Sequence, residues 1–201
     1  MGSLTTDQCA AAGSGRLPML MVVDVQNGFI TPSSAHVVPV VARLVDRWSQ
    51  TDAPVVFTRY FNYRGSPFER LVGWSGLMDA PDTDIVAELE HRSRGPRTHL
   101  LDKTTYTAFT AEAADLIATL GVTDVHLCGI ATDACILKTA LDLFEAGLTP
   151  WVITDACASN ASRHPPQQVH DSALMHMSRL LGAGQLIDSV QALSVIGILA
   201  A

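Results

Sequence analysis

Charged side chains are scarce in this sequence of 201 residues. Asp, Glu, Lys and Arg together make up 16%, against roughly 25% in an average soluble chain. Hydrophobic residues make up 48%, which excludes a disordered chain and allows one domain to bury a sizeable core. Because so small a charged fraction suggests surface buried between copies, we expect a homodimer or homotetramer.

Basic residues, paired cysteines and long apolar runs are also lacking. The 13 basic residues are outnumbered by 20 acidic ones, and the net charge of −7 excludes a nucleic-acid-binding surface. The four cysteines form no Cys-x-x-Cys pair and no zinc-type spacing, which disfavours a disulfide scaffold or a structural metal. The sequence shows no signal peptide, and the apolar segment 192–201 is too short for a membrane span of about 20 residues. We therefore expect a reduced, cytoplasmic protein without membrane contacts.

Apolar runs alternate with amphipathic segments along the chain, as in α/β proteins. Strands are predicted at 19–25, 54–60, 97–103, 124–130 and 149–156, and 184–188 fits a short sixth strand. Helices are predicted at 36–51, 83–92, 110–120, 133–146 and about 166–181. The alternation predicts a parallel sheet with helices on both faces, a three-layer α/β/α fold.

The remaining segments set the domain organisation. Residues 1–17 are small and polar and are expected to form a flexible lead-in, followed by a single domain over 18–201. Residues 61–81 are rich in Gly and Pro and are expected to form a long irregular loop, of a length that is usually functional.

Three reactive residue types fall at the carboxyl ends of predicted strands, where ligands bind in such sheets. Asp24 ends the first strand, Lys103 ends the third, and Cys135 lies in the first turn of the helix after the fourth. A helix start and a neighbouring ammonium both favour a thiolate, which predicts a nucleophilic cysteine with a lowered pKa. Taken singly, each has a structural alternative: Asp24 as a loop cap, Lys103 as a solvated strand end, Cys135 as a small buried hydrophobe.

Other candidate residues carry weaker signals. His164, His170 and His176 are six residues apart, so they do not share a helix face and do not form a metal site. Cys128 and Cys157 are interpreted as buried structural residues.

Three segments carry a family resemblance. The stretches VVDVQNGF (22–29), DKTTYTAF (102–109) and CGIATDACILKTALDLFEAGL (128–148) resemble the signature motifs of the isochorismatase-like cysteine hydrolases, a superfamily that includes nicotinamidases and N-carbamoylsarcosine amidase. The resemblance implies a six-stranded parallel sheet of Rossmann-like order 3-2-1-4-5-6 and a catalytic triad of Asp24, Lys103 and Cys135. It also implies a cis peptide between Ile130 and Ala131, and an oxyanion hole made by the Ala131 and Cys135 N–H groups.

The implied activity is the hydrolysis of a C–N bond in a small amide, ureido compound or lactam through a thioester. Two other interpretations stay open: an isochorismatase-type ether hydrolase that uses Asp24 without the thiol, and a catalytically silent binding subunit. Isochorismatases of this superfamily lack the cysteine, so Cys135 favours acyl transfer.

The resemblance breaks down just after the second strand. Nicotinamidases of this superfamily carry an Asp-x-His metal pair there, whereas this chain reads Tyr60-Phe61-Asn62. We therefore expect no metal and no other cofactor.

The substrate pocket is expected to be largely aromatic. Phe29 and Tyr106 flank the motifs, Trp74 comes from the long loop, and Tyr60 and Asn62 follow the second strand. Arg59, Arg64 and Arg70 either bind a substrate carboxylate or are solvated, and the sequence does not decide between the two.

Overall fold

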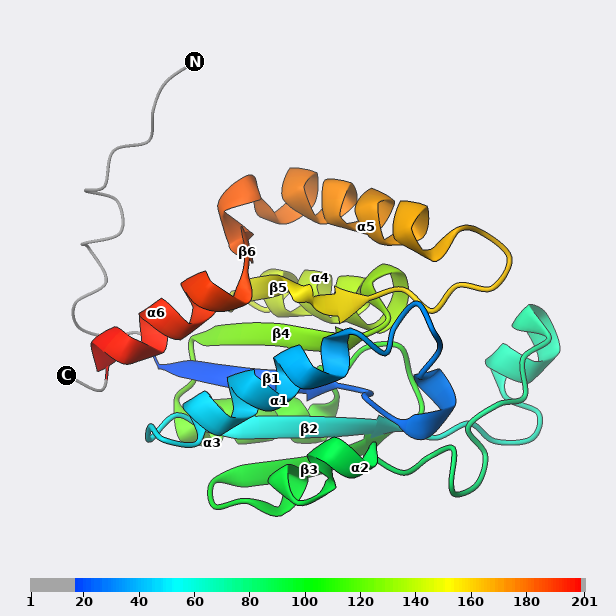
Figure 1. The fold of residues 1–201 in the computed structure, drawn as a ribbon, viewed down its shortest axis with the longest axis horizontal. Helices are drawn as coiled ribbons and strands as arrows, with labels where there is room; N and C mark the ends of the chain where they lie inside the picture. Colours follow the sequence, from blue (N-terminus) through cyan, green and yellow to red (C-terminus); the bar gives the residue numbers. More distant parts are fainter. Residues whose placement is uncertain (1–16, 200–201) are drawn as a thin grey trace.

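Six parallel strands form the centre of the molecule (Figure 1). The computed structural model describes residues 17–199, so the predicted lead-in lies almost wholly outside the described residues. The strands are β1 (Pro18–Val23), β2 (Val55–Tyr60), β3 (Thr98–Lys103), β4 (Asp124–Ile130), β5 (Thr149–Ala158) and β6 (Leu186–Ile187). Their order in the sheet is β3-β2-β1-β4-β5-β6, which confirms the predicted fold class and strand order.

Helices cover both faces of the sheet and complete the three layers (Figure 1). One face packs against α1 (Val37–Trp48), α2 (Ala87–Glu90) and α6 (Ser189–Leu199). The other packs against α3 (Ala111–Leu120), α4 (Leu137–Glu145) and α5 (Pro166–Leu181). Because both faces are covered, all six residues of β1 are buried, which explains its continuous apolar sequence.

Local sequence signals account for the helix ends. The Thr110 hydroxyl accepts a hydrogen bond from the Ala113 N–H and caps the start of α3. Gly121 ends the same helix with a φ of 66°, a left-handed conformation that glycine adopts without steric cost. Pro166 begins α5, where its missing N–H leaves no hydrogen bond unmade.

Three segments differ from the sequence predictions. The predicted helix 83–92 is α-helical only at α2, because Ile85 pairs with Gln26 and the Val86 N–H donates to the Val25 carbonyl. The predicted loop 61–81 contains a π-helical turn, η3 (Phe68–Val72). The apolar segment at the end of the chain belongs largely to helix α6, whose Ala192 and Ile196 pack into the core beside α1.

Apolar side chains also remain on the surface. Leu71 on η3 is 79% exposed and Val190 on α6 is 74% exposed. Over residues 17–199, none of the helices combines the length and the apolar character that crossing a membrane requires. Self-association through such surfaces stays a prediction.

Candidate active site

The side chains of Asp24, Lys103 and Cys135 meet in one buried cluster at the carboxyl edge of the sheet. The Lys103 ammonium lies 2.6 Å from Asp24 Oδ2 and 3.7 Å from Cys135 Sγ. Asp24 is fully buried, and Lys103 and Cys135 are 4% and 5% exposed. The structure therefore brings together the three residues that the sequence placed at separate strand ends.

Strand order and backbone conformation aim the carboxylate of Asp24. This residue directly follows β1 and has a φ of 53°, a left-handed conformation that Asp tolerates better than most residues. Thr58 on the neighbouring β2 donates its hydroxyl hydrogen to Asp24 Oδ1 at 2.7 Å, a contact that the sequence analysis missed. Gly129 on β4 lies beside Val23, and a Cβ atom there would come within 2.0 Å of the Val23 carbonyl oxygen. Only glycine lets β4 approach β1 this closely.

The ammonium of Lys103 is held by several oxygen atoms. Besides Asp24, it donates to the carbonyl oxygens of Thr105 at 2.8 Å and Tyr106 at 3.2 Å. Burial by itself lowers the pKa of Lys103, because it disfavours the charged form. The interactions with Asp24 and Cys135 raise this pKa by more, so the net direction is upward. Lys103 is therefore positively charged at neutral pH.

The acidity of Cys135 differs from the sequence prediction. Burial raises the pKa of the thiol, and the Asp24 carboxylate raises it further, while Lys103 and the Ala131 N–H act in the opposite direction. The net direction is upward, so the prediction of a lowered pKa was wrong. A helix start favours a thiolate only where water or cations offset the loss of hydration, and this thiol is almost completely buried. The resting cysteine is thus a neutral thiol beside a carboxylate.

This protonation state predicts slow alkylation of Cys135. At pH 7 iodoacetamide is expected to modify it more slowly than a free thiol with a pKa of about 8.5, because only the thiolate reacts. Since the folded-state pKa is raised, the rate should rise about tenfold per pH unit from pH 7 to pH 10 without levelling off, whereas a free thiol levels off above about pH 8.5. Mass spectrometry of the Cys135 peptide over pH 7–10 measures this, with the urea-unfolded chain as the control. Rapid labelling already at pH 7 would show that Lys103 and the turn lower the pKa of the thiol by more than burial and Asp24 raise it.

A π-helical turn, η5 (Thr132–Ile136), carries Cys135 between β4 and α4. The peptide bond between Ile130 and Ala131, just before this turn, is cis. The Ala131 carbonyl accepts hydrogen bonds from the N–H groups of Ala134 and Ile136, both at 3.1 Å. The Cys135 carbonyl accepts from the Thr139 hydroxyl at 2.6 Å. These bonds define the internal shape of the turn.

Five aromatic side chains gather beside the cluster. Phe29 and Trp74 stack with ring centroids 5.9 Å apart. Tyr60 packs against Trp74, and the Lys103 ammonium lies 5.4 Å from the centre of the Tyr60 ring. Phe68 contacts both Tyr60 and Tyr106, at 5.1 and 4.7 Å between centroids. The predicted aromatic residues are therefore neighbours in space. Phe68, from the same loop as Trp74, was missed.

Asn62 does not offer a metal ligand. It is buried, and its Oδ1 accepts from the Ser66 hydroxyl at 2.6 Å, the Tyr63 N–H at 3.0 Å and the Tyr60 hydroxyl at 3.3 Å. Its Nδ2 donates to the Trp74 carbonyl at 3.1 Å. The amide thus anchors the long loop, and the oxygen that would bind a metal ion already accepts three hydrogen bonds. Over residues 17–199, no three His, Cys, Asp or Glu side chains lie close enough together to hold a metal ion. The residues at this position therefore do not fit the metal that some relatives carry.

We expect hydrolysis to be independent of a divalent metal. Dialysis against 1,10-phenanthroline and EDTA should leave the rate within the error of the assay, because a neutral amide whose oxygen already accepts three hydrogen bonds is a poor ligand. Elemental analysis of the purified protein checks the same point. Loss of activity on chelation, restored by zinc, iron or manganese, would show that ligands outside this segment bind a metal.

The three arginines at the end of β2 and in the loop after it lie outside the buried cluster. Arg59 forms a two-pronged ion pair with Asp102, at 2.8 and 2.9 Å, and its guanidinium lies 5.1 Å from the Phe61 ring. Arg70 donates to the Gly65 carbonyl, and Arg64 is exposed. Arg59 is therefore already paired, which argues against a role in binding a substrate carboxylate.

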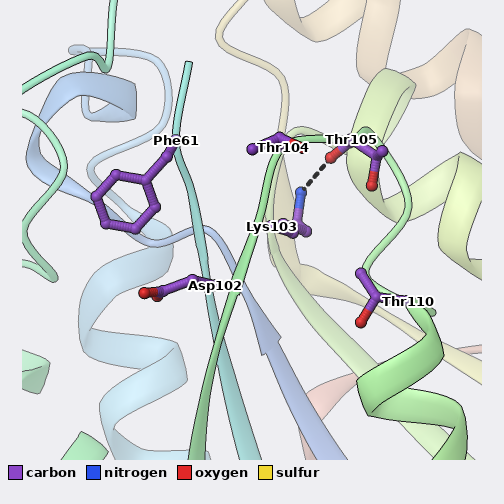
Figure 2. A pocket seen from close by; sticks show the side chains of 6 residues that line it. All are labelled: Phe61, Asp102, Lys103, Thr104, Thr105 and Thr110. Atoms are coloured by element: carbon purple, nitrogen blue, oxygen red, sulfur yellow. Dashed lines mark hydrogen bonds between the residues drawn. The ribbon is translucent and has the colours of Figure 1, made fainter. Parts of the chain in front are cut away.

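A cavity of about 430 Å³ lies beside the end of β3 (Figure 2). Its lining residues are Phe61, Asp102, Lys103, Thr104, Thr105 and Thr110. Figure 2 shows Phe61 and Asp102 on one side of the strand and Thr105 and Thr110 on the other, with the Lys103 amine directed at the Thr105 carbonyl. The lining includes neither Asp24 nor Cys135, so this cavity is adjacent to the thiol and does not enclose it.

Two further cysteines are structural in character. Cys128 and Cys157 are buried, and their thiols lie 3.8 Å from the carbonyl oxygens of Met21 and Leu127. Burial raises the pKa of Cys128 and raises that of Cys157 to about 12. Both thiols are therefore neutral at physiological pH.

The fold and the cluster together define a family of hydrolases. The family model of the isochorismatase domain matches residues 18–189, and the chain belongs to the isochorismatase family. Nicotinamidase 3 of Arabidopsis thaliana is 26% identical over 181 residues, which cover 87% of this chain and 86% of that protein. Isochorismatase domain-containing protein 2 of Bos taurus is 37% identical over 142 residues, covering 67% and 65% of the two chains. The crystal structure of N-carbamoylsarcosine amidase from Thermoplasma acidophilum covers 86% of this chain and 96% of its own, with a TM-score of 0.72 and 23% identity. That similarity shows a shared fold.

Proposed function

We propose that this protein is a cysteine-dependent amidohydrolase, which cleaves a C–N bond of a small amide, ureido compound or lactam. The observation that carries the proposal is the buried contact of a thiol, an ammonium and a carboxylate at the end of the sheet. Relatives named as a nicotinamidase and an N-carbamoylsarcosine amidase support a substrate of the amide class.

In the proposed first half-reaction Cys135 attacks the substrate carbonyl. Its proton passes to Asp24, whose carboxylate binds the same Lys103 ammonium that contacts the thiol. The thiolate therefore forms only as the carbon–sulfur bond forms. The carbonyl oxygen becomes an oxyanion that the N–H groups of Ala131 and Cys135 stabilise. Asp24 then protonates the leaving nitrogen and the C–N bond breaks. Ammonia or an amine departs, or in a lactam the amine stays attached to the acyl group, and a thioester remains on Cys135.

Water completes the proposed reaction. Asp24, again a carboxylate, takes a proton from a water molecule, and the hydroxide adds to the thioester carbonyl. Collapse of this intermediate releases the carboxylic acid and returns the proton to the Cys135 sulfur. Lys103 stays protonated throughout and holds the carboxylate beside the thiol, as its raised pKa allows. The aromatic residues beside the cluster limit the access of bulk water.

A screen for C–N cleavage tests the proposal. The purified chain is incubated with small primary amides and ureido acids, for which ammonia release is measured, and with lactams, for which the ring-opened amino acid is measured by mass spectrometry. Cys135→Ala is assayed in parallel on every compound. Turnover of a member of the panel by the wild type alone supports the proposed function. Turnover that survives in Cys135→Ala would favour a thiol-independent hydrolase, and no turnover by a folded protein across the panel would favour a binding subunit.

A further inference from the structure

A buried polar contact joins α5 to the turn that carries Cys135. Thr132 Oγ1 and His170 Nδ1 are hydrogen-bonded at 2.8 Å. Thr132 is fully buried, follows Ala131 directly and precedes Cys135 by three residues. Of the three histidines spaced six residues apart, His164 and His176 are exposed, whereas His170 is half-buried. The contact therefore links a distant helix to the residue next to the proposed oxyanion hole.

Apart from the 3.7 Å contact between the Lys103 ammonium and Cys135 Sγ, the other hydrogen bonds described for η5 join it to its own chain neighbourhood. The Ala131 carbonyl binds the N–H groups of Ala134 and Ile136, and the Cys135 carbonyl binds the hydroxyl of Thr139 on the following helix. Such bonds define the internal shape of the turn, and its hydrogen bond to β3 is the long one from Lys103 to the Cys135 sulfur. The shorter bond from Thr132 to a separate helix adds a restraint on how the turn lies against the sheet.

We propose that His170 is a positioning residue for hydrolysis, and that it acts through Thr132. By holding the Thr132 side chain, it orients the Ala131 N–H and the Cys135 thiol toward the carbonyl carbon and oxygen of the substrate. This inference rests on the proposed function and adds a residue outside the cluster of Asp24, Lys103 and Cys135. Misplacement of a reacting group by about 1 Å can cost roughly a hundredfold in rate, which is why one hydrogen bond to this turn matters.

The surroundings of His170 suit a neutral imidazole. A cavity of about 290 Å³ borders it, lined by Ser33, His36, Cys157, Ala158, Ser159, Pro166, Gln167 and His170 itself. Burial lowers the pKa of His170 and His36 lowers it further, while Asp171 on α5 and Asp133 on η5 act in the opposite direction. The net direction is downward. A neutral ring carries hydrogen on one nitrogen, and the Thr132 hydroxyl can donate to Nδ1 or accept from it, so the contact fixes the orientation of the ring in either tautomer.

Paired substitutions at both ends of the contact test the inference. His170→Leu and Thr132→Val remove the hydrogen bond at nearly constant volume, whereas His170→Asn and Thr132→Ser keep a polar atom at the same place. The first two are expected to lower kcat by about tenfold to a hundredfold with KM changed by less than about twofold, because orientation and not binding is lost. The second two should recover most of the rate. His176→Leu, exposed on the same helix, is the matched control and should behave as the wild type.

Two further measurements make the outcome decisive. The double variant His170→Leu/Thr132→Val should be no slower than either single variant, since both remove one interaction. Alkylation of Cys135 by iodoacetamide at pH 9, which needs no substrate, should change several-fold in the same two variants and not in His176→Leu. Wild-type kcat and alkylation rates in His170→Leu and Thr132→Val would overturn the inference, as would an Asn variant as slow as the Leu variant. If Cys135→Ala itself kept activity, the proposed function would fail instead.

Discussion

Replacing Cys135 by alanine is expected to lower kcat by about three to six orders of magnitude on any substrate that the screen identifies. The reason is that no other described side chain of the cluster can form the thioester. The two neighbours of Cys135 are the Asp24 carboxylate and the Lys103 ammonium, which bind each other at 2.6 Å. The thiol is small and almost completely buried, so its removal should cost only about 1 kcal/mol of folding free energy. Initial rates and thermal unfolding of the same preparation measure the two effects.

The control for this variant is Cys128→Ala. Cys128 is also buried but packs into the core on the face of the sheet that carries α1, whereas Cys135 belongs to the core on the other face. Cys128→Ala should therefore cost a similar amount of stability and leave the rate within a few-fold of wild type. A Cys135→Ala variant that keeps more than a tenth of the wild-type rate would remove the thiol from the mechanism.

Breaking the ion pair between Asp24 and Lys103 is expected to affect both rate and stability. Asp24→Asn removes the proposed proton acceptor and should reduce kcat nearly as far as Cys135→Ala does. Lys103→Met leaves the Asp24 charge buried without its partner, which typically costs about 3–5 kcal/mol. Because the pKa of Lys103 is raised in the folded state, the pair stabilises the fold below the ordinary lysine pKa of about 10.4 and the contribution is lost only as the pH rises beyond it.

The double variant separates the two effects. Asp24→Asn/Lys103→Met has no buried charge at this point and should be more stable than Lys103→Met, yet equally inactive. Asp102→Asn is the matched control, because Asp102 precedes Lys103 on β3 and forms an exposed ion pair with Arg59. That pair should contribute less than about 1 kcal/mol, and its loss should leave the rate unchanged. Urea unfolding measures the stability of each variant, and initial rates measure its activity. A double variant less stable than Lys103→Met would show that the ion pair does not explain the loss.

Much of the fold could be predicted because it rests on local signals. The run at 19–25 predicted β1, and the helices predicted at 110–120 and about 166–181 lie where α3 and α5 are found. Helix α6 was missed because its residues are apolar almost all around, so no helical period shows in the sequence. The helix predicted at 83–92 was too long, because pairing of Ile85 with Gln26 competes with helical hydrogen bonds.

The sequence by itself determined which residues stand at the ends of the strands: Asp24, Lys103 and Cys135 follow apolar runs, and parallel strands end at one edge. Only the tertiary structure decided their chemistry. The upward shift of the Cys135 pKa follows from burial and from Asp24, which is 111 positions away in the chain, and a helix start alone suggested the opposite. Thr58 and Phe68 beside the cluster, and His170 behind the turn, likewise depend on contacts between distant segments. Local pattern specifies an element and its ends, whereas desolvation and long-range hydrogen bonding arise only once the elements pack.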